Sequence, residues 1–188
     1  MLTKSAAAFR LLLIVSFVTL PLAARAQTVS AACKPVLDAN TKEISTPHHA
    51  YQTESIWAKG APVKGAPVKN SEIISTATAS YVLVDGKWTR LNITPKENIA
   101  QMQENLRNAK VYACRTLPDA SVNGVPTLVY SAHAENDMAK NDAQFWVAKS
   151  TGLIVREDID MYADGSDGKR HISTRYDYTN VQPPPGVK

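Results

Sequence analysis

Motifs for nucleotide binding and for covalent catalysis are missing from this sequence. It contains no glycine-rich phosphate loop, no dinucleotide-binding fingerprint and no G-x-S-x-G nucleophile motif. Its four histidines and two cysteines are too few and too scattered to place a nucleophile beside a general base. We therefore expect a protein that is not an enzyme, with no catalytic residues and no cofactor.

Metal-binding patterns are missing too. His48 and His49 are adjacent, so in a strand their side chains would point to opposite faces and could not share one metal ion. The acidic residues around the ADGSDG segment (163–168) do not have the spacing of a calcium-binding loop. No metal site is predicted.

Long hydrophobic runs are missing except at the N-terminus. Lys4 and Arg10 precede the apolar run at residues 11–24, and Ala24-Arg25-Ala26 provides a small-x-small cleavage pattern. The run is too short and too close to that pattern for a membrane-spanning helix. We interpret residues 1–26 as a signal peptide and residues 27–188 as a single domain in the periplasm or outside the cell.

An excess of basic residues is also missing once the signal peptide is set aside. The whole chain has a net charge of +4, and removal of Lys4, Arg10 and Arg25 leaves 4 − 3 = +1. The remaining lysines and arginines are scattered, so no nucleic acid partner is expected.

Cys33 and Cys114 form an even pair in an oxidising compartment, and a disulfide between them is the default expectation. The alternative is a lipidated Cys33. The sequence SAAC, however, lacks the large apolar residue usually found three places before a lipidated cysteine.

Two helices are predicted. The first covers residues 29–44, and Pro35 places its regular part near that residue. The second begins at Thr94, which with Glu97 can form a capping box. An apolar stripe at helical spacing follows in the second helix: Ile99, Met102, Leu106 and Ala109.

The rest of the chain indicates strands. A strand is expected at residues 48–58, a surface loop at the tandem GAPVKGAPVK (60–69), and a hairpin that turns at Asp85-Gly86. Five more runs are separated by turn-rich segments that include residues 118–124 and 135–142: residues 110–117, 125–135, 144–148, 153–162 and 170–178. Their spacing is typical of an antiparallel meander. The fold class is α+β.

The hairpin around KSTG decides which residues share a face. With an even loop, Ala148 pairs with Leu153 and Trp146 with Val155. One face then carries Trp146, Ala148, Leu153 and Val155, and the other Phe145, Val147, Ile154 and Arg156. In the last strand, Ile172, Thr174, Tyr176 and Tyr178 alternate with more polar residues.

The segment WVAKSTGLIV (146–155) resembles the W-V-D-x-x-T-G-L-P hairpin of LolA-like periplasmic proteins, the lipoprotein-carrier superfamily. Trp146, Val147, Thr151, Gly152 and Leu153 match, whereas Ala148 and Ile154 replace the usual Asp and Pro. The resemblance implies an incomplete antiparallel β-barrel, a half-barrel whose apolar face is covered by the N-terminal and mid-chain helices. It also implies that the protein holds a lipid, an acyl chain or a lipoprotein.

Together these observations predict a carrier or sensor of a hydrophobic ligand in the cell envelope. The expected ligand-binding residues are Tyr130, Trp146, Leu153, Val155, Ile172, Tyr176, Met102 and Leu106. The alternative is a protein–protein interaction module with a filled core and an envelope protein as its partner.

Overall fold

The computed structural model describes residues 30–58, 61–137, 139–163 and 168–187. The predicted signal peptide, its cleavage site and most of the ADGSDG segment lie outside the described residues. Within the described parts, no helix is long and apolar enough to cross a membrane.

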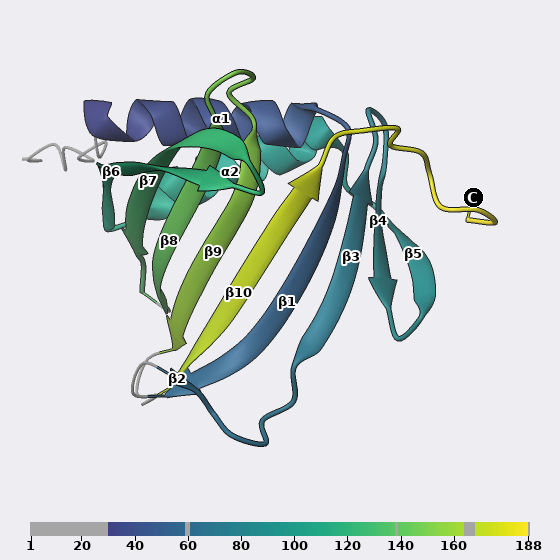
Figure 1. Cartoon of the computed structure of the whole chain (residues 1–188), viewed down its shortest axis with the longest axis horizontal. Coiled ribbons are helices and arrows are strands. Elements are labelled where there is room, and N and C mark those ends of the chain that lie inside the picture. Colours follow the sequence, from purple (N-terminus) through teal and green to yellow (C-terminus); the bar gives the residue numbers. More distant parts are fainter. Residues whose placement is uncertain (1–29, 59–60, 138, 164–167, 188) are drawn as a thin grey trace, which may run out of the picture.

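One antiparallel sheet of ten strands forms the body of the molecule (Figure 1). Its strands are neighbours in the order β5-β4-β3-β1-β10-β9-β8-β7-β6, with the short β2 paired to β1. The end strands β5 and β6 do not pair with each other, so the sheet is an open half-barrel, as predicted. The strands are β1 (His48–Ala58), β2 (Ala61–Pro62), β3 (Lys69–Ser75), β4 (Ser80–Val84), β5 (Lys87–Leu91), β6 (Val111–Val122), β7 (Val125–Glu135), β8 (Ala139–Ala148), β9 (Ile154–Ala163) and β10 (Gly168–Asp177).

Two hairpins turn at residues with positive φ. Asp85 and Gly86 have φ values of 51° and 75°, which confirms the predicted hairpin between β4 and β5. Asn123 and Gly124 repeat the arrangement between β6 and β7, at 51° and 83°. Such values at both central residues match the right-handed twist of the flanking strands.

Strands extend into two segments that were predicted as turns. β6 continues through residues 118–122, and its register shifts between Leu117 and Ala120. Pro118 lies within that shift, where the pairing with β7 is interrupted. A proline is tolerated there because its missing N–H removes no hydrogen bond from the ladder. The turn expected at residues 135–142 is shorter, because β8 already begins at Ala139, whose backbone N–H donates to Asn136 Oδ1 over 2.9 Å.

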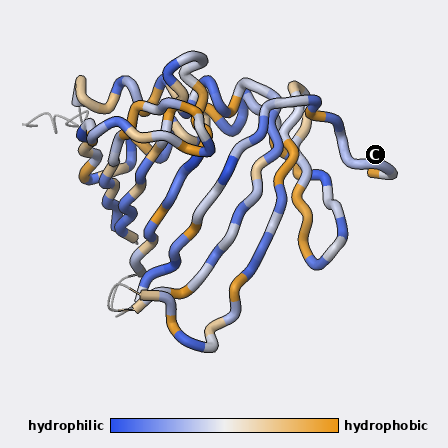
Figure 2. Tube along the Cα trace, in the orientation of Figure 1, coloured by the Kyte–Doolittle hydropathy of each residue, from blue (hydrophilic) through white to orange (hydrophobic). Residues whose placement is uncertain are grey.

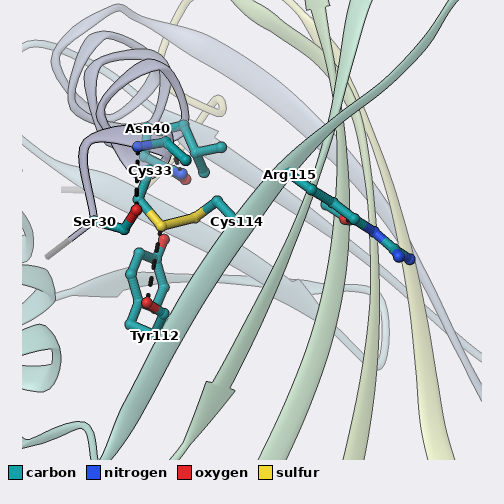
Figure 3. Close-up of a disulfide and its surroundings, with 9 residues drawn as sticks. Ser30, Cys33, Asn40, Tyr112, Cys114 and Arg115 are labelled. Carbon is teal, nitrogen blue, oxygen red and sulfur yellow. Dashed lines mark hydrogen bonds between the residues drawn. A yellow bond between two sulfur atoms is a disulfide. The ribbon is translucent and has the colours of Figure 1, made fainter.

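Both predicted helices are present. A short 3-10 turn, η1 (Ala31–Cys33), leads into α1 (Lys34–Ser45), and α2 (Pro95–Asn108) follows β5. Thr94 and Glu97 form the predicted capping box at the start of α2. The predicted disulfide joins Cys33 to Cys114 on β6, with the two Cα atoms 5.0 Å apart (Figure 3). It ties the beginning of α1 to the edge of the sheet.

The sheet has two different faces. We call the side against which α1 packs the helix face, and the opposite side the open face. In Figure 3, Arg115 points away from the disulfide at the adjacent Cys114, which illustrates the alternation between the two faces. The main apolar core lies on the helix face and consists of Val36, Ala39, Tyr130, Ala132, Phe145, Val147 and Ile154.

The middle of the helix face, over β10, β1 and β3, is polar. Figure 2 shows that the long strands β9, β10 and β1 are largely hydrophilic, with only separated hydrophobic stretches. Arg170 binds Glu54 through two hydrogen bonds of 2.7 and 3.0 Å, and Ser71 donates to Gln52 over 3.1 Å. Apolar surface available for a ligand is therefore concentrated beside the helices.

Candidate functional site

Helix α2 is amphipathic, yet none of its residues is buried. Its apolar stripe, Ile99, Met102 and Leu106, is half-buried, while the remainder of the helix is mostly exposed. An amphipathic helix normally buries its apolar stripe against a core. This helix instead contacts α1 and leaves a space between itself and the sheet.

That space is a cleft of about 590 Å³ between α1, α2 and the end of the sheet formed by β6, β7 and β8. We call it the α2 cleft. Its apolar wall is formed by Leu37, Met102, Leu106, Ala109, Tyr112, Ala134 and Phe145. Its volume falls in the range of typical small-molecule sites, about 300 to 1,000 Å³.

The rest of the α2 cleft is rich in carboxamides. Its amide-bearing residues are Asn40, Asn98, Gln101, Asn105, Asn136 and Asn141. Asn141 differs from the others because its Oδ1 atom is buried and has no hydrogen-bond partner among the described residues. Buried polar atoms normally have a partner, so this oxygen marks a position where one is needed.

The lining of the α2 cleft has almost no charge. Among the described residues, it includes no lysine, arginine or histidine, and its one acidic residue is Glu135. The Glu135 carboxylate itself lies on the open face, 3.4 Å from the ammonium of Lys140 and 3.8 Å from His133 Nε2. The lining also lacks serine, threonine and cysteine, so it offers no side-chain nucleophile beside a base.

A cluster of titratable side chains lies near the end of α1 on the helix face. The Tyr176 hydroxyl donates to Glu157 Oε2 over 2.9 Å. Burial raises the pKa of Glu157 to about 7. The negative charges of Glu43 and Asp158 add to this rise, whereas the hydrogen bond from Tyr176 opposes it. Burial and the nearby Glu157 likewise raise the pKa of Tyr176.

Glu43 and His48 complete this cluster, with Glu43 Oε1 3.0 Å from His48 Nε2. Both side chains are nearly inaccessible to solvent. Burial lowers the pKa of His48, but the hydrogen bond and charge of Glu43 outweigh it, and the net pKa is raised. The cluster joins α1 to β1, β9 and β10.

The predicted binding residues fall into separate groups. Met102 and Leu106 line the α2 cleft. Tyr130 belongs to the core, and Tyr176 packs against that core. Ile172 is buried in β10, where it lies opposite Ile159. These last three residues lie outside the lining of the cleft.

The predicted pairing of Trp146 with Val155 is wrong. The Ala148 N–H does donate to the Leu153 carbonyl, as expected, and Val147 pairs with Ile154. The register then shifts, so that Trp146 pairs with Arg156 and Val155 is an additional residue in β9. Such a bulge changes the face of every residue beyond it.

The core lies on the other face from the one predicted to be apolar, and the shift does not cause this, because Val147 pairs with Ile154 in either register. Phe145, Val147 and Ile154 form the core on the helix face. Trp146 lies on the open face, with the Arg156 guanidinium carbon 4.7 Å from the centre of its ring. Trp146, Leu153 and Val155 do not line the α2 cleft.

Several residues of the cleft were not predicted, including Leu37, Tyr112, Asn141 and Phe145. Leu37 lies within the predicted first helix, residues 29–44, and could have been proposed from that helix. Asn141 lay in a segment predicted as a turn, so its position on the helix face had no signal in the sequence.

The open face carries a second hollow of about 650 Å³ over β6 to β10. It contains His133, whose Nδ1 is 2.8 Å from Asp142, and His171, whose Nδ1 is 2.7 Å from Asp160. Within the described residues, no group of three or more metal-ligating side chains comes together here or elsewhere.

No protein-family model and no curated protein matches this chain. Several solved structures are similar in fold. LprF from Mycobacterium bovis has a TM-score of 0.41 and 11% identity, covering 83% of this chain and 97% of its own. Lipoprotein LppX from Mycobacterium tuberculosis has a TM-score of 0.39 and 13% identity, covering 81% and 97%.

A putative outer membrane lipoprotein-sorting protein domain from Vibrio parahaemolyticus has a TM-score of 0.27 and 6% identity, covering 79% of this chain and 93% of its own. At TM-scores this low the likeness does not assign a function, which has to be inferred from the α2 cleft itself.

Proposed function

We propose that the protein binds a hydrophobic or amphiphilic small molecule, such as a lipid, in the α2 cleft, as a non-enzymatic carrier or sensor in the cell envelope. The observation that carries the proposal is an amphipathic helix with no buried residue, on which Met102 and Leu106 of the apolar stripe line a cleft. Apolar surface left unburied in this way is a characteristic of binding sites.

The energetics favour an apolar ligand. Each methylene transferred from water to an apolar site contributes about 0.8 kcal/mol, and association costs at least about 4 kcal/mol. A chain of roughly ten methylenes therefore exceeds that minimum cost through the hydrophobic effect alone. The half-buried Met102 and Leu106 on α2 would gain further burial when such a ligand enters.

A titration with 1,6-diphenylhexatriene, an uncharged hydrocarbon that fluoresces in apolar sites, tests the proposal. The protein should give a saturable increase in fluorescence. Met102→Arg and Leu106→Arg should each weaken binding by about tenfold or more, since each places a charge in the cleft.

Gln103→Arg is the matched control, because Gln103 is exposed on the same helix outside the lining of the cleft. It should leave the affinity unchanged, with circular dichroism showing that all three variants retain the fold. No saturable signal, or equal losses in all three variants, would contradict the proposal and favour an interaction module instead.

A further inference from the structure

Within the α2 cleft, the position of Asn141 limits what the polar end of a ligand can be. Asn141 lies on β8, opposite Ala134 of β7 on one side and Met161 of β9 on the other. Directly opposed residues share a face of the sheet, and neither of these two side chains carries a hydrogen-bond donor. The buried Asn141 Oδ1 is an acceptor without a donor among the described residues.

The environment of Asn141 also limits the charge of the ligand. Among the described residues, the lining of the cleft offers an anionic head group no lysine, arginine or histidine. A cationic group would find no counter-ion either, because the Glu135 carboxylate pairs with Lys140 and lies 3.8 Å from His133 Nε2, on the open face. An uncharged polar end is therefore favoured, because burying an unpaired charge is costly.

Hydrogen-bond chemistry decides between the uncharged groups. An ester or ether can only accept hydrogen bonds, so it would leave Asn141 Oδ1 unsatisfied after water is excluded. That oxygen has no surface open to the cleft, so the Asn141 carboxamide has to rotate before a hydroxyl or an amide N–H of the ligand can donate to it. A site built around a buried acceptor discriminates strongly against analogues that lack the donor.

We infer that the ligand of the α2 cleft is an uncharged amphiphile whose polar end carries a hydroxyl or amide N–H that donates to Asn141 Oδ1. Its apolar part would lie against Tyr112 and Phe145, next to Met102 and Leu106. This inference rests on the proposed function and specifies its ligand class.

Competition against bound 1,6-diphenylhexatriene tests the inference. Four amphiphiles of equal acyl length are compared below their critical micelle concentrations: a 1-monoacylglycerol, a primary fatty amide, a fatty-acid methyl ester and the ionised fatty acid. The hydroxyl and amide compounds should bind about tenfold more tightly than the ester and the carboxylate.

Asn141→Leu should remove this preference, leaving the affinity of the ester unchanged and lowering that of the hydroxyl and amide compounds to the same level. Gln103→Leu is the matched control, since Gln103 is an exposed carboxamide on α2 outside the lining of the cleft. It should keep the preference.

The outcomes separate the inference from the proposed function. If the methyl ester competes as well as the monoacylglycerol in the unaltered protein, the inference is overturned while the proposed function stands. A preference that persists in Asn141→Leu also overturns it. If the hydrocarbon probe and all four amphiphiles fail to bind, the proposed function itself is overturned. The comparison in the unaltered protein remains decisive even if a variant does not fold.

Discussion

The Tyr176 hydroxyl on β10 donates a 2.9 Å hydrogen bond to the Glu157 carboxylate on the neighbouring strand β9. Glu157 lies opposite Phe145 on the helix face, next to the apolar core. A carboxyl group in such surroundings favours its neutral form. This is why the pKa of Glu157 is raised to about 7 in the folded protein.

Stability should therefore fall as the pH rises from about 4.5 to about 7. The folded protein keeps the Glu157 proton in this window, whereas the unfolded chain, with an ordinary glutamate pKa, releases it. The shift corresponds to roughly 3 kcal/mol of unfolding free energy. Glu157→Gln mimics the neutral form, so urea unfolding should show a variant more stable than the original at pH 8 and equal to it near pH 4.

A smaller pH dependence should remain in Glu157→Gln. The pKa of His48 is raised by Glu43, so its contribution is present below about pH 6.5 and lost as the pH rises further. Glu104→Gln is a suitable control, because Glu104 is exposed on α2 beside Arg107. If Glu157→Gln loses stability at pH 8, the raised pKa is contradicted.

The disulfide between Cys33 and Cys114 should contribute substantially to stability. It closes a loop across 81 residues of sequence, and the chain-entropy model gives such a loop about 4 kcal/mol. The double variant Cys33→Ala/Cys114→Ala should unfold at lower urea concentration, and the original protein should shift equally in the presence of a reductant. Intact-mass measurement after alkylation should find no free thiol in native material. A free Cys114 together with a lipid-sized mass increase would support a lipidated Cys33 instead.

Capping of α2 gives a third prediction. The Thr94 side chain accepts a hydrogen bond from the Glu97 N–H over 3.2 Å, and Thr94→Ala should cost about 1 kcal/mol of helix stability. Because α2 has no buried residue, the loss should appear as faster amide hydrogen exchange within residues 95–108. Amides of α1 should be unaffected. Exchange in α2 as slow as in the central strands would show that the helix is packed more firmly than the structure indicates.

Local patterns in the sequence were sufficient to predict the two helices and the succession of helices and strands along the chain. Thr94 with Glu97 specifies a helix start, and Asp85-Gly86 specifies a tight hairpin, because each signal depends on residues close together in the chain. The α+β half-barrel followed from such elements together with the resemblance of the hairpin at residues 146–155. The disulfide followed from compartment and cysteine number.

The site was harder to predict, because it depends on register and on packing between distant elements. A single additional residue, Val155, places Trp146 opposite Arg156 and Phe145 opposite Glu157. The core lies at Phe145 and Val147, which share a face with Ile154 in either register. Nothing in the local sequence distinguishes the regular hairpin from the bulged one. The distance of α2 from the sheet, and the unsatisfied Asn141 beneath it, depend on tertiary structure alone.

The adjacent residues Phe145 and Trp146 provide a direct test of which face binds the ligand. Phe145 lines the α2 cleft and is 5% exposed, whereas Trp146 points to the open face and stacks with Arg156. Phe145→Leu removes part of the apolar wall and should weaken 1,6-diphenylhexatriene binding by about three- to tenfold. Trp146→Leu should change the affinity for 1,6-diphenylhexatriene by less than about twofold. This variant should lose about 1 kcal/mol of unfolding free energy, the size of the cation–π contact with Arg156. Urea unfolding verifies that both variants are folded under the conditions of the titration. A loss of affinity in Trp146→Leu as large as that in Phe145→Leu would show that the ligand binds on the open face, as the unbulged hairpin had predicted.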